Sequence, residues 1–359
     1  MISNNTTRRF LAAVLVTALM IITQTGCAGK SEGSSEAAVP VSKDSFYFDT
    51  ICSIAVFDMD DMSDENARNA IDAAFAACAE YEGLLSRTKE GSDIRRINEA
   101  KGESVDCDPR TAQLLTMSLP YCAESEGKFD VTIGRISTLW DFHAEKPAVP
   151  SAELIESGLA SVNYKNVEIG EETAEKKVPV RLADPEAMLD LGAVAKGYIA
   201  DRICEVLREE GVTSAIVSLG GNISCVGAKP SGDGGSVPFS IGVETPFSDR
   251  TEILGTIPCD NGTVVTSGIY ERCFEENGKL YHHILDANTG YPCETDVIGV
   301  TIVSGEGKSM DCDALATVCL LLGSEKGKAL VERTEGVEAL FVTEEGISMT
   351  SGMAFERKK

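Results

Sequence analysis

The chain has 359 residues, enough for two domains or one large one, and its 43% hydrophobic and 25% charged residues exclude wholesale disorder. It carries 57 acidic against 32 basic residues, which gives a formal net charge of −25. This charge argues against nucleic acid as a partner, because binding to a phosphate backbone needs a basic face.

The first 26 residues have the features of an export signal. Two arginines precede an apolar run at 10–22, which is too short to cross a bilayer as a helix. Small residues then lead to Cys27 in a pattern that resembles a bacterial lipobox, although Gln24 stands where an aliphatic residue is preferred. The resemblance implies cleavage before Cys27 and its lipidation; the alternative is a plain signal peptide with an incidental cysteine.

Several acyl chains on Cys27 would hold the exported protein on the extracytoplasmic face of a bacterial cell membrane. The residues that follow are small and polar, the composition of a flexible tether. We therefore expect a signal peptide at 1–26, a lipidated cysteine and tether at 27–43, and one folded domain at 44–359. The remaining cysteines are odd in number and cannot all pair, so we expect mostly reduced, buried thiols.

Hydrophobic periodicity predicts an irregular mixture of helices and strands. In the first part of the domain we expect a strand at 46–57, helices at 64–85, 111–124 (with Pro120 as a kink or break) and 194–210, and a strand at 215–219. After residue 237 we expect strands at 239–243, 252–257, 263–266, 280–285, 297–303, 339–342 and 347–349, and a helix at 309–322. Clustered strands with segregated helices indicate an α+β fold, with mixed or antiparallel sheets and helices packed alongside.

The stretch LDLGAVAKGY at 189–198 is the most informative motif. We expect a strand to deliver Asp190 and a helix to begin near Val194, whose free N–H groups could bind an anion. Lys196 would add a positive charge for phosphate. The glycine spacing fits neither a P-loop nor a dinucleotide fingerprint, and a tight strand–helix junction explains the stretch equally well. The glycine pair at 220–221 likewise fits either a close ligand approach or a simple turn.

Two further sites could carry chemistry. His282 and His283 are adjacent on an expected strand, so one of them at most enters a given site; that residue could handle a proton, or both could be solvated. Asp313 and Thr317 are four residues apart and share a helix face, an arrangement that suits a hard cation such as Mg²⁺. Alternatively, Asp311 caps this helix and Asp313 lies in its first turn without any metal.

Several blocks of sequence, taken together and in order, resemble one known family. They are FDT at 48–50, SDIRRIN at 92–98, FDVTIG at 129–134, LWDF at 139–142, LDLGAVAKGY at 189–198, SLGGNI at 218–223, VTSGIYER at 265–272, HILDANTGYP at 283–292 and DCDALAT at 311–317. These blocks are similar to those of the ApbE family of FAD:protein FMN transferases. The resemblance covers about residues 46–354, essentially the whole mature domain.

The resemblance implies an enzyme that takes FAD as substrate, uses Mg²⁺, and attaches FMN to a threonine hydroxyl of a partner flavoprotein while AMP leaves. It implies metal ligation by the Asp313 carboxylate, the Thr317 hydroxyl and the Ala193 carbonyl, with Lys196 aiding at the phosphates. His283 is assigned as the base for the incoming hydroxyl. The positions implied to line FAD are Phe48, Thr88, Trp140, Asp141, Phe142, Asp190, Lys196 and Leu285.

The chain departs from the family pattern at several positions. Thr88 stands where many members have a tyrosine that can stack on flavin, Asp141 replaces a common glycine, and Ala287 replaces a proline. Loss of the aromatic ring could admit water, so Mg²⁺-dependent hydrolysis of FAD to FMN and AMP is one alternative. Another is an FAD-binding lipoprotein without turnover. The acceptor could be a subunit of a membrane redox complex or a secreted flavoprotein.

Overall fold

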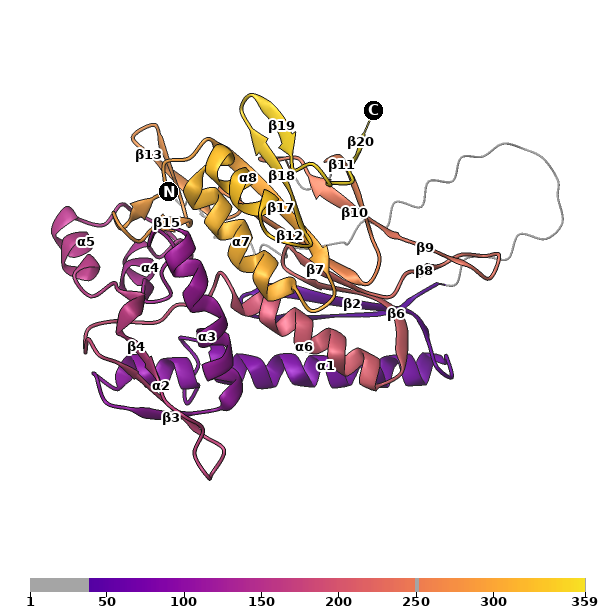
Figure 1. Cartoon of the computed structure of the whole chain (residues 1–359), viewed down its shortest axis with the longest axis horizontal. Coiled ribbons are helices and arrows are strands. Elements are labelled where there is room, and N and C mark those ends of the chain that lie inside the picture. Colours follow the sequence, from indigo (N-terminus) through magenta and orange to yellow (C-terminus); the bar gives the residue numbers. More distant parts are fainter. Residues whose placement is uncertain (1–38, 249–251, 359) are drawn as a thin grey trace, which may run out of the picture. The chain divides into compact units, whose positions relative to one another are not determined.

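The computed structural model describes residues 39–248 and 252–358 (Figure 1). The predicted signal peptide, Cys27 and most of the tether lie outside these residues. The first strand, β1, is Val41–Tyr47, so regular structure begins slightly before residue 44 and takes in the end of the predicted tether. Within the described ranges, no helix is both long and apolar enough to cross a membrane.

An eight-stranded sheet with the order β1-β2-β6-β7-β12-β17-β18-β19 forms the centre of the domain. Every pair of neighbours in it is antiparallel. Beside β1, its strands are β2 (Thr50–Met59), β6 (Val212–Leu219), β7 (Asn222–Val226), β12 (Gly262–Gly268), β17 (Val297–Gly305), β18 (Val337–Thr343) and β19 (Gly346–Met349).

The two faces of this sheet belong to two different hydrophobic cores, because successive strand residues point to opposite faces. On β12, for example, Val265 lies in the larger core and Val264 in the smaller one. The larger core is covered by four helices (Figure 1). They are α1 (Asp64–Leu85), α6 (Ala195–Glu209), α7 (Ser309–Leu322) and α8 (Ser324–Glu332). The smaller core is closed by the sheet of β10 (Phe239–Glu244), β11 (Ile253–Cys259) and β20 (Glu356–Arg357).

Further helices and short strands complete the domain. The helices are α2 (Asp93–Glu99), α3 (Pro109–Glu124), α4 (Gly134–Trp140), α5 (Ala152–Leu159) and a 3₁₀ turn, Tyr164–Asn166. The strands are β3 (Val105–Cys107), β4 (Val167–Ile169), β5 (Val178–Leu182), β8 (Lys229–Pro230), β9 (Ser236–Val237), β13 (Cys273–Glu276), β14 (Lys279–His282), β15 (Leu285–Asp286) and β16 (Tyr291–Pro292). All the described residues belong to one compact unit, which confirms the predicted single α+β domain.

Three local predictions were wrong. The strand expected at 46–57 is a hairpin of β1 and β2, which turns at Phe48 and Asp49 with φ of 54° and 56°. The strand expected at 280–285 is divided between β14 and β15. Asp190 follows no strand but an extended segment held by one bridge between Met188 and Ile133. By contrast, α7 has the predicted bounds, and α3 continues through Pro120.

The eleven described cysteines are free thiols, and all but Cys273 are buried. Burial raises the pKa of most of these thiols, for example to about 12 for Cys122 and Cys293. This agrees with the expectation that the cysteines behave as small core residues.

Candidate functional site

Helices α6 and α7 touch at Gly197. A β-carbon at this position would lie 2.2 Å from the carbonyl oxygen of Ser309, so a side chain would force the helices apart. The Gly197 backbone N–H donates to Oδ2 of Asp313 at 2.9 Å. Lys196 Nζ lies 3.8 Å from Oδ1 of Asp313 and donates to the Gly192 carbonyl at 3.1 Å. The crossing therefore brings together Lys196 and Asp313, which belong to two separate sequence motifs.

The Asp313 carboxylate is poorly solvated, with 2% of the residue exposed. Burial raises its pKa, while Lys196 and the Gly197 N–H oppose that rise. Thr317 lies one turn further along α7, and its hydroxyl makes no hydrogen bond with the rest of the described chain. Ala193 is in the turn that leads into α6. The oxygen groups available as ligands are thus one buried carboxylate, one free hydroxyl and the backbone carbonyl of the turn before α6.

This donor set fits a hard divalent cation better than a transition metal. In the described ranges, no group of three histidine, cysteine or acidic side chains could hold a metal. Mg²⁺ does not need such a group, because it is usually held by one or two carboxylates and completes its shell with water and substrate phosphates. Zinc would require more nitrogen or sulfur ligands than this site offers.

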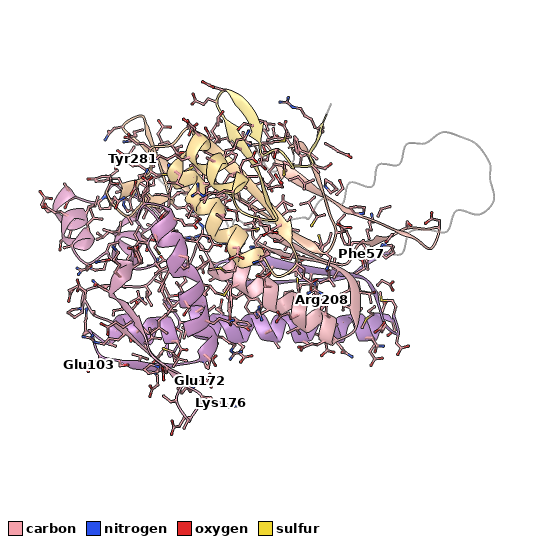
Figure 2. The ribbon with its side chains drawn as sticks, in the orientation of Figure 1. Phe57, Glu103, Glu172, Lys176, Arg208 and Tyr281 are labelled. Carbon is pink, nitrogen blue, oxygen red and sulfur yellow. The ribbon has the colours of Figure 1, made fainter. Side chains whose placement is uncertain are left out.

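Aromatic side chains surround Trp140, the single tryptophan of the chain. Its ring stacks on Phe142 with centroids 5.8 Å apart and planes 6° apart, and Nε1 donates to the Gly290 carbonyl at 2.8 Å. Asp141 ends α4 in a left-handed conformation, with φ of 32°, so the chain reverses between the two stacked rings. The ring centroid of Tyr281 on β14 (Figure 2) lies 5.6 Å from that of Trp140, and Leu285 packs in the same cluster.

His282 and His283 have different environments. His282 is buried, its Nδ1 has no partner, and burial lowers its pKa to about 4. His283 is partly exposed, and its Nδ1 lies 3.3 Å from the Arg272 carbonyl, which also accepts the His283 backbone N–H at 3.0 Å. A carbonyl oxygen only accepts, so a hydrogen bond from the ring here requires the tautomer with the proton on Nδ1 and a lone pair on Nε2. Burial lowers the pKa of His283 to about 3, and the charges of Arg272, then of His282 and least of Lys196 act in the same direction. His283 therefore stays neutral near Lys196.

Comparison with known proteins decides the family. The sequence profile of the ApbE family matches residues 48–341. The chain belongs to the ApbE family. It is 36% identical over 274 residues to a FAD:protein FMN transferase of Klebsiella pneumoniae (strain 342), covering 75% of this chain and 80% of the relative. It is 33% identical over 299 residues to the FAD:protein FMN transferase of Treponema pallidum (strain Nichols), covering 82% of each.

Solved ApbE structures share the fold. The ApbE protein of Thermotoga maritima superimposes with a TM-score of 0.75 at 31% identity, covering 89% of this chain and 97% of that chain. The apo form of the Pseudomonas stutzeri flavinyl transferase ApbE superimposes with a TM-score of 0.73 at 27% identity. The match covers 87% of this chain and 95% of that chain. The α+β architecture predicted from the sequence is thus that of the ApbE family.

Two residues outside the predicted set contact Asp190, one of the positions expected to line FAD. Asp190 accepts from Ser137 Oγ at 2.6 Å and from the Gly192 N–H at 2.9 Å. Arg87 Nε lies 3.6 Å from the same carboxylate, and its Nη1 donates to Thr138 at 2.7 Å. Neither Arg87 nor Ser137 was predicted as a site residue. Arg87 directly precedes Thr88, a position expected to line FAD, and this neighbourhood was the signal that could have indicated it.

Phe48 and Thr88 lie near the C-terminal end of α1. The Phe48 N–H donates to Glu82 at 2.9 Å, and the other Glu82 oxygen accepts from Lys89 at 3.1 Å. The Thr88 hydroxyl lies 3.2 Å from Ser86 Oγ. Glu82 therefore ties the turn that carries Phe48 to the segment that carries Thr88, although the two are far apart in sequence.

The structure shows the roles of the glycine pair at 220–221 and of Asp311. Gly220 and Gly221, with φ of 57° and 90°, form the two-residue turn of the β6–β7 hairpin, so the pair needs no ligand to explain it. Asp311 does not cap α7, because the N-cap position is Lys308. The Asp311 carboxylate instead accepts from the Tyr121 hydroxyl at 2.7 Å.

Proposed function

We propose that this chain is a FAD:protein FMN transferase, which moves FMN from FAD onto a threonine hydroxyl of a partner flavoprotein and releases AMP. Relatives with this name that are 36% and 33% identical support the assignment. The observation that carries it is the α6–α7 crossing, where the Asp313 carboxylate meets Lys196 and the Gly197 N–H. A site with both a buried carboxylate and a lysine suits a bound cation beside phosphate.

The reaction is a phosphoryl-type transfer between two oxygens. The threonine hydroxyl oxygen forms a bond to the FMN-side phosphorus of the pyrophosphate, and the bond from that phosphorus to the AMP oxygen breaks. The hydroxyl proton goes to a base, and AMP leaves as the anion. We assign Lys196 to the phosphate oxygens, because its ammonium group reaches the Asp313 carboxylate at the partly exposed start of α6.

Mg²⁺ would be held by Asp313, Thr317 and the Ala193 carbonyl, with substrate phosphate and water oxygens completing its shell. When bound, the cation would neutralise the negative charge that develops on the phosphate oxygens. Burial of Asp313 supports this assignment. Removal from water destabilises the charged carboxylate, so a bound cation stabilises it more than it would stabilise an exposed carboxylate.

His283 is the proposed base, acting through Nε2. The Nδ1–H bond to the Arg272 carbonyl orients the ring and leaves Nε2 free to accept the threonine proton. A pKa of about 3 describes the site without substrate, where Arg272 and Lys196 add their charges to the effect of burial. An anionic pyrophosphate beside Lys196 offsets that positive charge, which raises the proton affinity of His283 when the substrate is present.

The aromatic cluster and Asp190 form the proposed flavin side of the site. Trp140 and Leu285 are buried in one apolar cluster and Phe142 is partly exposed at its edge, while Asp190 is fixed by Ser137 and Arg87. Apolar walls with a few oriented polar groups are typical of cofactor-sized pockets.

Intact-mass spectrometry tests the proposal. The full chain is incubated with FAD, Mg²⁺ and a flavoprotein that carries an exposed acceptor threonine. Transfer adds one FMN to the mass of the acceptor and releases one AMP. AMP without a gain in acceptor mass would indicate hydrolysis, and bound FAD without AMP would indicate a binding protein.

Hydrolysis of FAD is the second candidate, and Thr88 favours it. Thr88 offers no ring to cover the flavin, and its hydroxyl is near Ser86 instead. We expect Thr88→Tyr to tighten FAD binding, since an added stacking platform is worth about 1–3 kcal/mol, and to suppress acceptor-free AMP release. Thr88→Val, which matches threonine in shape without adding a ring, is the control. If Tyr and Val variants hydrolyse FAD equally, Thr88 does not determine the outcome.

We also propose export and lipid anchoring through Cys27. The support is the sequence at 1–27 alone, with its arginine pair, short apolar run and lipobox-like end. Expression in a bacterium fed labelled palmitate should label the wild type and not Cys27→Ser. Cys273→Ser, which removes the exposed thiol of the described domain, should label like the wild type.

A further inference from the structure

The N-terminus of α7 is capped by a side chain from another helix. Asp201 of α6 accepts the Ser309 N–H with Oδ1 at 3.0 Å and the Met310 N–H with Oδ2 at 3.1 Å. The residue at the N-cap position of α7, Lys308, makes no side-chain capping hydrogen bond. Asp201 is 7% exposed and 108 residues away from Ser309 in sequence. One carboxylate thus satisfies two of the N–H groups that a helix start leaves free.

The same face of α6 also contacts the part of α7 that carries Asp313. Gly197 and Asp201 are one turn apart on α6, and Ser309 and Asp313 are one turn apart on α7. Gly197 binds Asp313, while Asp201 binds the backbone of Ser309 and its neighbour. Two contacts on successive turns fix both the position of α7 along its axis and its rotation about that axis.

The Ser309 side chain adds a third attachment, to the central sheet. Its hydroxyl donates to Asn222 Oδ1 at 2.8 Å and accepts from Thr263 at 3.1 Å. All three residues are buried. The start of α7 is therefore held by α6 on one side and by β7 and β12 on the other, so a change at Asp201 would be transmitted along the helix to Asp313 and Thr317.

We infer that Asp201 is a positioning residue for the cation site: by capping α7 it sets the direction in which Asp313 and Thr317 present their oxygens. This inference rests on the proposed function. Asp201 itself contacts neither Asp313 nor Thr317 and acts through the α7 backbone. Groups that orient metal ligands without touching the metal typically change affinity about 10- to 100-fold when removed.

Mn²⁺ binding measures the effect directly. Free Mn²⁺ is followed by EPR during titration of the full chain with FAD present and no acceptor. We expect Asp201→Ala to weaken Mn²⁺ binding about 10- to 100-fold, and Asp201→Asn to weaken it less, because the amide oxygen still accepts one N–H. The loss of FMN transfer in both variants should be recovered in part by raising Mg²⁺, as a defect in cation affinity requires.

Two controls separate this role from general helix capping. Asp108→Ala removes the cap of α3, whose Asp108 accepts the Arg110 N–H, and Asp311→Ala removes the Tyr121 contact from the first turn of α7 itself. Both should bind Mn²⁺ like the wild type. A folded Asp201→Ala chain with wild-type Mn²⁺ affinity would overturn the inference, and Asp201→Asn serves the same purpose if the alanine variant does not fold. Absence of Mn²⁺ binding and of FMN transfer in the wild type would instead contradict the proposed function.

Discussion

Gly197 packs its backbone directly against the carbonyl group of Ser309, with no room for a side chain between the two helices. This contact lets the Gly197 N–H reach Asp313, and it places Lys196 beside the same carboxylate. The site thus depends on a residue with no side chain, and the need for glycine comes from packing rather than from backbone conformation.

Gly197→Ala should therefore damage both stability and activity. The new methyl group would overlap the Ser309 carbonyl, and overpacking of this kind costs about 1–3 kcal/mol. We expect a lower free energy of unfolding in urea and a higher Mg²⁺ requirement for FMN transfer. The matched control is Gly83→Ala on α1, where a β-carbon meets nothing within 4 Å. That variant should gain about 0.5–1 kcal/mol from helix propensity, and equal behaviour of the two variants would contradict the packing argument.

The elements of this site differ in how far the sequence predicts them. The bounds of α7 follow from its continuous apolar pattern, and Asp313 and Thr317 share a face by spacing alone. The turn at Phe48 was missed because phenylalanine, unlike the aspartate that follows it, is not a usual left-handed residue. The structure anchors that turn through Glu82, a contact 34 residues away. Local propensity does not report such long-range hydrogen bonds.

The same limit applies to groups that act on another side chain. Asp190 was predicted from its motif, but Ser137 and Arg87, which fix its carboxylate, come from α4 and from the loop after α1. Asp201 lies in a helix that was predicted, yet its role depends on the crossing of α6 and α7. Residues within a family motif could be predicted from the sequence, whereas the side chains that hold them in place are visible only in the structure.

Asp313→Ala should abolish metal-dependent transfer, because the site loses its single carboxylate. Loss of a cation that supplies several kcal/mol of charge stabilisation corresponds to about a hundredfold or more in rate. The rate is measured at limiting Mg²⁺ from the mass gain of the acceptor. Asp311→Ala is the control, since Asp311 lies on the same helix but contacts Tyr121 and Lys308. Unchanged turnover in Asp313→Ala would contradict the metal assignment.

His283→Gln should slow transfer about 10²- to 10⁴-fold, the usual contribution of a general base. Glutamine keeps a polar side chain of similar reach but accepts no proton at neutral pH. FAD binding, followed by flavin fluorescence, should change little, so that the effect is on the rate of the chemical step. His143→Gln, in the exposed segment after α4, is the control. Equal rates for the two variants would mean that another group takes the threonine proton.

His282 should make stability depend on pH. Burial lowers its pKa from 6.5 to about 4, so the folded protein keeps the ring neutral where the unfolded chain would protonate it. The stabilisation is complete above about pH 6.5 and is lost as the pH falls through 4, a change of about 3 kcal/mol at most. Urea unfolding of His282→Gln between pH 7 and 4 should show a shallower decline than the wild type.

The comparison uses the slope with pH rather than the stability at one pH, because a buried glutamine can itself cost stability. His143→Gln should follow the wild-type slope, since His143 is exposed and its removal leaves His282 in place. Parallel curves for His282→Gln and the wild type would show that His282 titrates in the folded state much as it does in the unfolded chain. In that case water would reach the His282 ring, although its Nδ1 is buried without a partner in the described chain.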